Sequence, residues 1–317
     1  LELTLFFNKK NVSMKQFKII KQFILFIIIS TVASFGQSAG NTGLSFLKYG
    51  FGARNIAMGD AGTALSNDLT GLFYNPARLA MTDKSEVLFM HNQWIQDVNS
   101  EVIGAKTELW GIPFALGFNV TSIDGIEYRE IPGEPVTTFD ANYFYGSLST
   151  GFFVTDEISF GAGIKYLYEG LLNDEATGFG FDFGLNYLLP YKGLTASAVV
   201  KNIGSMNALR NEKTKLPTEL RIGTSYTYNL EDSKFDFTGG LEYQKYLDTE
   251  DNHFNFGGEV LYNKLIAARA GYQTGYESRG FTAGIGLMWG NLKFDYAFLP
   301  FSYGLGNANL FSLQFKF

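Results

Sequence analysis

Hydrophobic and polar residues alternate along most of this chain. Near its C-terminus, LFSLQFKF places Phe311, Leu313, Phe315 and Phe317 on one face and polar residues on the other. A period of two residues is the pattern of a β-strand with one apolar and one polar face. The same pattern predicts about fourteen strands of roughly ten residues, the length that a tilted strand needs to cross a bilayer. The predicted strands lie near 86–93, 101–108, 112–122, 141–153, 158–168, 179–189, 194–203, 217–228, 235–246, 253–262, 265–273, 281–289, 292–298 and 309–317.

The connections between these strands alternate in length. Short ones are expected at 109–111, 154–157, 190–193, 229–234, 263–264 and 290–291, and longer ones at 94–100, 123–140, 169–178, 204–216, 247–252, 274–280 and 299–308. Tight turns on the periplasmic side and longer loops outside are typical of outer-membrane barrels. Because lipid does not tolerate an open strand edge, the strands must close. We therefore predict an all-β fold, a transmembrane outer-membrane β-barrel of about 14 antiparallel strands.

Aromatic residues favour a membrane barrel over a soluble sheet, where they would reflect only β-propensity. Tyr and Trp gather near the predicted strand ends, for example Trp110, Tyr187 and Trp289, as expected for girdles at the two membrane interfaces. The last strand ends on Phe315 and Phe317. Such an aromatic end resembles the signal by which the barrel-assembly machinery recognises outer-membrane proteins.

Composition excludes several other classes of protein. Of 317 residues, 16% are aromatic and 18% are charged, and there is no Cys. The net charge of −6 disfavours a nucleic-acid binder, which would carry a basic stripe. Without Cys there is neither a disulfide framework nor a thiolate metal site. No segment after the first 36 residues approaches the ~18 continuous apolar residues of a membrane helix.

The start of the chain has the order of a targeting segment. Residues 1–13 precede the first Met, and the sequence leaves open whether they are translated. Three Lys within 15–21 precede the apolar run 23–32, and small residues follow it. This order predicts a signal peptide, so that upstream residues and signal peptide occupy 1–36 and the chain is exported to the bacterial outer membrane. The alternative is a membrane anchor, which the shortness of the apolar run disfavours.

Residues 37–85 do not follow the strand pattern. The part from Gly50 to Ala64 is rich in small residues, and Asp68 and Pro76 could each begin a short helical turn. A barrel of about fourteen strands has a lumen too wide for its own side chains to fill. We therefore expect 37–85 to be a plug, or hatch, inside a barrel formed by 86–317. The alternative is a loose periplasmic tail.

Short motifs in this segment resemble a known family. They are Gly52-Ala53-Arg54, Met58-Gly59, Asp68 and Asn75-Pro76-Ala77. They resemble the N-terminal signature of the PorV/PorQ family, Bacteroidetes outer-membrane proteins that are similar to FadL fatty-acid channels. Asp60 and Arg78 stand where that signature has Gly, and the resemblance covers residues 50–80. It implies a plug motif formed by Gly52, Arg54, Met58, Gly59, Asp60, Asp68, Asn75 and Pro76.

The resemblance implies a role without catalysis. PorV/PorQ-like proteins are components of the type IX protein secretion system, either cargo shuttles or subunits of the attachment complex. Such a protein would meet a translocon or secreted cargo through its outer loops, here 123–140 and 204–216. The alternative is a FadL-like channel for apolar small molecules, with an apolar pocket behind the plug and an opening in the wall. Apart from these partners, outer-membrane lipid is the surrounding that we expect.

The sequence offers little for an active site. Its two His residues, His91 and His253, lie on different predicted strands, and we expect neither catalytic residues, nor a metal, nor a cofactor. Glycine pairs such as Gly161 with Gly163 and Gly284 with Gly286 lie inside predicted strands, so they do not have the context of a phosphate loop. Glycine in a barrel strand more often allows bending or the close approach of a plug.

Charged residues on the polar faces are expected to line the lumen. The acidic ones are Asp182, Asp236, Glu242 and Asp295, and the basic ones are Lys165, Arg221, Arg269 and Lys293. We expect pairing across the wall or to the plug rather than a path for charged solutes. Arg54 in particular should meet an inward carboxylate, for which Asp182 and Asp295 are our candidates, because a buried guanidinium needs a partner.

Overall fold

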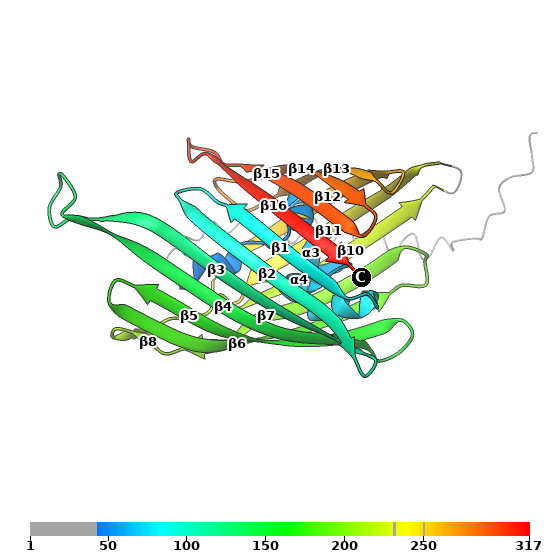
Figure 1. Ribbon diagram of the computed structural model, residues 1–317, viewed down its shortest axis with the longest axis horizontal. Coiled ribbons are helices and arrows are strands. Elements are labelled where there is room, and N and C mark those ends of the chain that lie inside the picture. The colour runs from blue at the N-terminus through cyan, green and yellow to red at the C-terminus, as the bar shows by residue number, and fades with distance from the viewer. Residues whose placement is uncertain (1–42, 231–232, 250) are drawn as a thin grey trace, which may run out of the picture. The chain divides into compact units, whose positions relative to one another are not determined.

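A computed structural model describes residues 43–230, 233–249 and 251–317 (Figure 1). The predicted signal peptide lies outside these residues. Short helical elements come first: η1 (Ser45–Lys48), α2 (Ala53–Ala57), α3 (Gly62–Leu65), α4 (Gly71–Tyr74) and η2 (Pro76–Met81). None of the helices in the described part of the chain is long and apolar enough to span a membrane.

Fourteen antiparallel strands of the described chain then close into a barrel, which confirms the predicted all-β barrel of about 14 antiparallel strands. They are β1 (Glu86–Gln93), β2 (Val98–Leu109), β3 (Ile112–Tyr128), β4 (Thr137–Phe153), β5 (Ile158–Leu171), β6 (Asp174–Leu188), β7 (Leu194–Met206), β10 (Glu219–Asn229), β11 (Phe235–Tyr246), β12 (Asn252–Tyr262), β13 (Ile266–Gln273), β14 (Phe281–Trp289), β15 (Leu292–Pro300) and β16 (Asn307–Lys316). The barrel closes where β1 pairs with β16, with Phe89 opposite Leu313. The C-terminal alternating segment is thus the closing strand.

The two faces of the wall differ as the alternation predicts. In β6, Phe181 and Phe183 point outward and are exposed, whereas Asp182 between them is buried and points inward. Strand pairing keeps this order around the barrel, because a one-residue slip would exchange the faces. Two interruptions occur, one between β3 and β4 near residues 124–125 and one between β6 and β7 near 201–202.

Several predicted loops are shorter than the sequence suggested. The connection expected at 123–140 shrinks to 129–136, because β3 and β4 continue their pairing beyond the alternating region. That expected at 169–178 shrinks to residues 172–173. The connection expected at 204–216 contains a small hairpin of β8 (Ala208–Leu209) and β9 (Glu212–Lys213). In these hairpins the backbone hydrogen bonds between strands continue where the side chains no longer alternate. The alternation in the sequence therefore ends before the strands do.

Residues 43–82, here called the N-terminal segment, pack against the inward face of the strands (Figure 1). The element α2 contacts β13 to β16, α3 contacts β7, β10 and β11, and η2 contacts β3 to β6. Asn75 caps η2, since its side chain accepts a hydrogen bond from the Ala77 N–H. The Asp68 side chain accepts hydrogen bonds from the N–H and hydroxyl of Thr70, just before α4. The helical turn expected at Pro76 is present as a 3₁₀-helix, whereas the one expected at Asp68 begins only at Gly71, with Thr70 at its N-cap.

The outward face of the wall allows a first prediction. Phe181→Arg is expected to lower the free energy of unfolding in lipid by about 2–4 kcal/mol, because the charge falls in the middle of an apolar band. Glu175→Arg is the matched control: Glu175 also points outward on β6 but lies at the strand end, where the cost is about 0–1 kcal/mol. Urea titration of the protein refolded in vesicles measures both. Equal losses at the two positions would mean that the outward face does not meet lipid.

Candidate functional site

The Met58-Gly59 motif is where the N-terminal segment comes closest to the wall. A Cβ on Gly59, whose φ is +70°, would lie 2.2 Å from the backbone oxygen of Phe256. The Gly59 N–H donates to the Thr282 hydroxyl, which in turn donates to the Ala57 oxygen. Only glycine combines this backbone conformation with this approach. The motif therefore seats the segment on β12, β13 and β14.

Asp60 follows in a buried cluster around Arg221 on β10. The Arg221 guanidinium contacts three carboxylates: Glu219 at 3.1 Å, Glu242 at 3.1 Å and Asp60 at 3.4 Å. Tyr74 donates to the other oxygen of Asp60 at 2.5 Å. Asp60, which departs from the PorV/PorQ signature, thus supplies the carboxylate by which the segment joins this cluster.

Arg54 leads into a second cluster, but not with the partners that we expected. It donates two hydrogen bonds to Glu259 on β12, at 2.8 and 3.0 Å, rather than pairing with Asp182 or Asp295. Asp182 instead pairs with Lys165 on the neighbouring strand, at 2.7 Å. Arg54 does pair with an inward carboxylate, as predicted. That carboxylate is Glu259, which lies 205 residues from Arg54 in sequence and comes close to it in the closed barrel.

From Glu259, a series of ion pairs runs across neighbouring strands and returns to the N-terminal segment at Asp68. Arg269 contacts Glu259 at 2.5 Å and Asp295 at 2.8 Å. Lys293 joins Asp295 at 3.3 Å to Asp68 at 2.9 Å. Arg54 and Asp68 are therefore the two ends of one chain of alternating charges, tied to three strands. We call these six residues, Arg54, Glu259, Arg269, Asp295, Lys293 and Asp68, the Arg54 chain.

The Asn75-Pro76-Ala77 motif contacts the wall near the short turns. A Cβ on Gly161 would lie 2.1 Å from the Ala77 nitrogen, so glycine in β5 permits the close approach expected of it. The Asn75 amide donates to the Leu185 oxygen of β6 at 3.1 Å. Gly52, at the other end of the motif region, has φ +91° and begins α2.

Arg78 is the second departure from the family signature. It donates to the Ser66 oxygen at 2.6 Å and to the Asn186 side chain on β6 at 2.9 Å. Burial and the neighbouring Arg54 lower the pKa of the Arg78 guanidinium to about 10. It therefore stays charged at neutral pH and ties the segment to the wall without a carboxylate in contact.

Burial and ion pairing shift the pKa values of Asp68, Arg54 and Tyr74 in the N-terminal segment. Burial favours the neutral form of Asp68, but Lys293 and Lys316 outweigh it and hold the Asp68 pKa well below its usual range. Burial likewise opposes the charge of Arg54, and Glu259 outweighs it, so that the Arg54 pKa is raised. Burial and the Asp60 charge raise the Tyr74 pKa well above its ordinary value. These three groups keep their protonation states across the neutral range.

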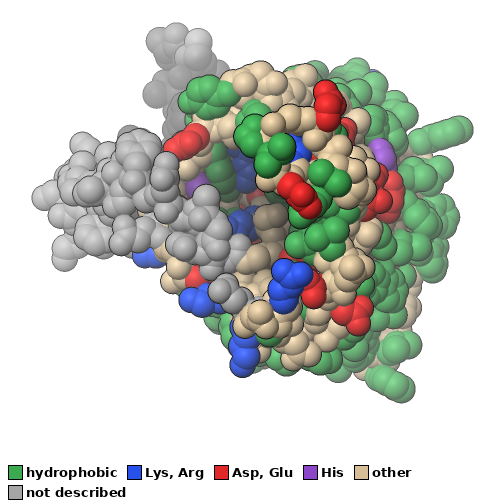
Figure 2. All heavy atoms as spheres, turned by 90° about the vertical axis from the view of Figure 1, so that its left-hand side faces the viewer, with side chains coloured by type: hydrophobic (Ala, Val, Ile, Leu, Met, Phe, Trp, Pro, Cys, Tyr) green, Lys and Arg blue, Asp and Glu red, His purple; other side chains and the backbone are tan. Residues whose placement is uncertain are grey.

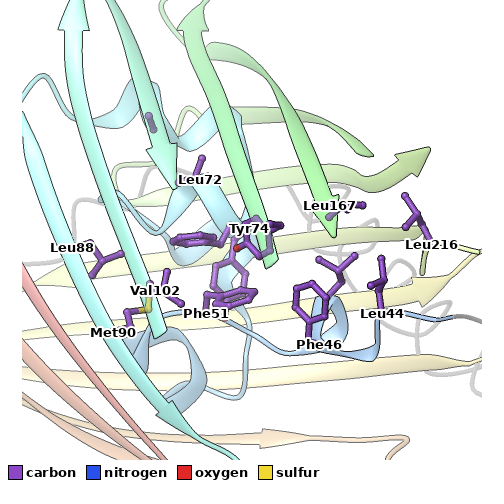
Figure 3. Close-up of a cluster of buried hydrophobic side chains, with 14 of the residues drawn as sticks. Leu44, Phe46, Phe51, Leu72, Tyr74, Leu88, Met90, Val102, Leu167 and Leu216 are labelled. Carbon is purple, nitrogen blue, oxygen red and sulfur yellow. The ribbon is translucent and has the colours of Figure 1, made fainter. Parts of the chain in front are cut away.

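The lumen also contains a cluster of buried apolar side chains. Figure 3 shows it running from Leu88 and Met90 past the rings of Phe51 and Tyr74 to Leu216. The inward side chains of β4 and β5 contribute Tyr145 and Leu167, both almost fully buried. The Phe46 ring lies 6.1 Å from that of Tyr145, and the Phe51 ring 5.8 Å. The barrel therefore encloses an apolar strip beside its buried charges.

The end of the barrel near the β3–β4 connection is hollowed. Figure 2 shows this end, with Lys and Arg side chains visible inside the hollow and hydrophobic side chains over the outer face. Aromatic residues lie in this region beside basic ones: Lys48 over the Tyr246 ring at 4.9 Å, and Arg279 over the Tyr276 ring at 4.0 Å.

The two histidines are not brought together. His253 is buried and stacks on Tyr276 with ring centroids 3.7 Å apart, whereas His91 points outward from β1. Among the described residues no group of three or more His, Asp or Glu is arranged to hold a metal ion.

Sequence reasoning missed several residues that contact the N-terminal segment. Glu259 and Asn186 were not singled out, nor were the aromatic residues Phe46 and Tyr145. Glu259 carried one usable signal, because it is an acidic residue at an inward position of an alternating strand. Tyr145 carried none, since an aromatic residue at a lumen position of a strand looks like an error in the alternation, and Phe46 lies in η1, outside the alternating strands.

Comparisons with known proteins show the fold. No protein-family model matches this sequence, and no curated protein matches it significantly. Among solved structures, the Pseudomonas putida toluene transporter TodX is similar, with a TM-score of 0.59 and 14% identity over 84% of this chain and 97% of that one. The CymD monoaromatic hydrocarbon channel is similar too, with a TM-score of 0.59 and 12% identity over 84% and 97% of the two chains. The barrel described above is thus of the kind found in these channels.

Proposed function

We propose that this protein is an outer-membrane channel for apolar small molecules and that its N-terminal segment is a plug. This was the alternative interpretation of the sequence, and it now has more support than the secretion role. The observation that carries it is the apolar cluster inside the barrel. Half of the cluster belongs to the N-terminal segment, including Phe46 and Phe51, and the other half to the barrel, including Leu167. Under the proposal, the barrel half becomes the apolar surface that a solute needs when the segment moves aside.

The cluster lies beside an irregular part of the wall. Leu167 and Leu216, which belong to it, flank Gly180 on β6, and each would be within 3.7 Å of a Cβ placed there. The pairing of β6 with β7 is interrupted next to this point, where Asn202 has φ +59°. Under the proposal, an apolar molecule moves along the cluster, and the interruption is where the wall most easily admits it.

The similar structures agree with this class of solute. TodX is described as a toluene transporter and CymD as a monoaromatic hydrocarbon channel. At 12–14% identity they share the barrel with this chain, and their solutes guide the choice of probe. Toluene is therefore the first molecule to test.

The secretion role remains a prediction from the motif resemblance. It required outer loops at 123–140 and 204–216 as working surfaces, and both are partly built into strands. A pull-down from native membranes separates the two functions. Recovery of a translocon or a secreted protein in constant ratio would favour secretion, and recovery of the barrel alone would favour the channel.

A charge placed in the apolar cluster tests the channel. Leu167→Asp is expected to reduce toluene uptake into proteoliposomes by about tenfold or more, because a carboxylate at this fully buried position raises the barrier for an apolar solute. Leu167→Met is the matched control, since it keeps volume and polarity. Heat-modifiable migration on gels verifies that both variants fold. Unchanged uptake by folded Leu167→Asp would remove the apolar cluster from the transport route.

A further inference from the structure

Two buried asparagines interrupt the apolar inner surface of the barrel at β1 and β3. Asn92 on β1 and Asn119 on β3 both point inward and are 0% exposed. Among the described residues, neither amide atom of Asn92 has a hydrogen-bond partner. The Asn119 Nδ2 donates to the Thr121 hydroxyl at 3.0 Å, but the Asn119 Oδ1 has no partner in the same part of the chain. Because a buried amide group without a partner costs free energy, two of them at neighbouring places call for an explanation.

Both asparagines lie beside the apolar cluster. Asn119 is the register partner of Val102 on β2 and of Tyr145 on β4, and both of these residues belong to the cluster. Asn92 is the next inward residue after Met90, another member. The side chains of directly paired residues on one face of a sheet lie about 5 Å apart at their Cβ atoms. A molecule that lies on the cluster at Tyr145 is therefore within reach of an amide that lacks a partner.

Aromatic rings of the N-terminal segment cover this part of the wall. The Phe46 ring is stacked on that of Tyr145, with centroids 6.1 Å apart, and lies 5.3 Å from that of Tyr143 (Figure 3). The Phe51 ring meets Tyr145 edge-on at 5.8 Å. A phenyl ring brings neither a donor nor an acceptor, so these rings leave the Asn119 Oδ1 without a partner. When the segment moves aside, an aromatic solute that takes the place of the rings is able to supply the missing hydrogen bond.

We propose that Asn92 and Asn119 select aromatic solutes that carry a hydroxyl group, that is, phenols in preference to plain hydrocarbons. A hydroxyl both donates and accepts, so it pairs with the Asn119 Oδ1 or with either atom of the Asn92 amide while its ring lies on Tyr145. A site built to bind a hydroxyl disfavours the analogue without one, because the buried polar groups of the site then stay unpaired.

The surroundings favour a neutral hydroxyl over a charged group. The inward register partners of the two asparagines are uncharged: Ser100 and Leu310 for Asn92, and Val102 and Tyr145 for Asn119. A carboxylate or an ammonium group at this place would therefore be buried without an opposite charge. This inference rests on the proposed channel function and narrows its class of solute.

Isothermal titration calorimetry of the protein in nanodiscs tests the site with p-cresol and p-xylene, which are similar in shape and differ by a hydroxyl in place of a methyl group. Titrations into empty nanodiscs are subtracted to remove the contribution of lipid. We expect wild type to bind p-cresol about tenfold more tightly than p-xylene, the effect of one hydrogen bond to a group otherwise unpaired. Asn119→Leu should remove this preference and Asn92→Leu should reduce it. Heat-modifiable migration verifies that both variants fold, as expected when an apolar side chain replaces an unpaired amide.

Asn255→Leu is the matched control. Asn255 points inward from β12, is 0% exposed, and has an Oδ1 without a partner among the described residues, but none of the cluster residues lies on β12. Its replacement should leave the preference for p-cresol unchanged.

Three results would overturn the proposal: equal affinities of wild type for the two ligands, a preference that survives in both Asn119→Leu and Asn92→Leu, or the same loss of preference in Asn255→Leu. The first two would mean that buried water satisfies the amides. Tight binding of p-xylene without a preference for p-cresol would remove this inference and leave the channel intact, whereas binding of neither ligand would contradict both.

Discussion

Arg221→Met is expected to destabilise the barrel by about 3–5 kcal/mol, the largest effect of any single substitution proposed for this chain. Arg221 is 1% exposed and contacts Asp60, Glu219 and Glu242. Methionine fills similar volume but leaves three buried carboxylates around an apolar side chain. Lys201, at 2.8 Å from Glu219, compensates only one of them. The cost therefore arises from the charges left behind rather than from the interaction lost.

Urea unfolding in vesicles, followed by heat-modifiability, measures this loss. Arg210→Met is the control: Arg210 pairs with Asp174, but it is 75% exposed, so its removal should cost only about 0–1 kcal/mol. A second comparison removes a carboxylate together with the cation. Arg221→Met combined with Glu242→Gln should recover part of the loss, because one fewer charge is then buried without a partner. Equal midpoints for the Arg221 and Arg210 variants would mean that the cluster is solvated.

The strands of the wall could be predicted because the same requirement, an apolar outward and a polar inward side chain, repeats every two residues. Lipid on one side and a charged lumen on the other leave alternation as the main requirement on each strand, and the C-terminal Phe311 to Phe317 show it as clearly as β6 does. The ends of strands were less predictable. Hairpins such as β3–β4 continue by backbone pairing alone, where side chains no longer need to alternate.

For contacts between the N-terminal segment and the wall, the sequence predicts the chemical type of the partner residue but not which residue it is. A buried arginine requires a carboxylate, so a partner for Arg54 followed from chemistry. Which carboxylate it is depends on how the strands close and on the height at which the segment sits. Asp295 lies in the same Arg54 chain but is separated from Arg54 by Glu259 and Arg269, whereas Asp182 pairs with Lys165. The position of a residue in three dimensions, not its type, decided between them.

Asp60 and Arg78, the two residues that differ from the resembled signature, both attach the N-terminal segment to its surroundings. Asp60 joins the Arg221 cluster, and Arg78 reaches Ser66 and Asn186. Each of these side chains contacts a buried polar group at a position where the resembled signature has Gly. Charged substitutions in a small-residue segment are therefore best interpreted as sites of attachment, to be matched with polar residues at inward positions of the strands.

Arg54→Ala is expected to release the N-terminal segment while the barrel stays folded. Loss of the two hydrogen bonds to Glu259 and of the one to the Leu65 oxygen should weaken the seating of the segment by about 2–5 kcal/mol. Arg269 remains on Glu259, so the wall keeps a partner for that carboxylate. In planar bilayers the variant should conduct ions several-fold more than wild type, and limited proteolysis should cut within 43–82 sooner. Heat-modifiability should not change, since hydrogen bonding between the strands holds the barrel together without the segment.

Lys165→Met provides the control, because it removes a buried cation that pairs with Asp182 on the wall, and its ion pair does not involve the N-terminal segment. It should lower stability without raising conductance, whereas Arg54→Lys should fall between Arg54→Ala and wild type, since it keeps the charge but not the two parallel bonds. Equal conductance of the Arg54 and Lys165 variants would mean that Arg54 does not hold the segment. If the wild-type segment is cut as fast as a free tail, there is no plug, and the proposed channel must then be open at rest, with the apolar cluster lining a permanently hydrated lumen.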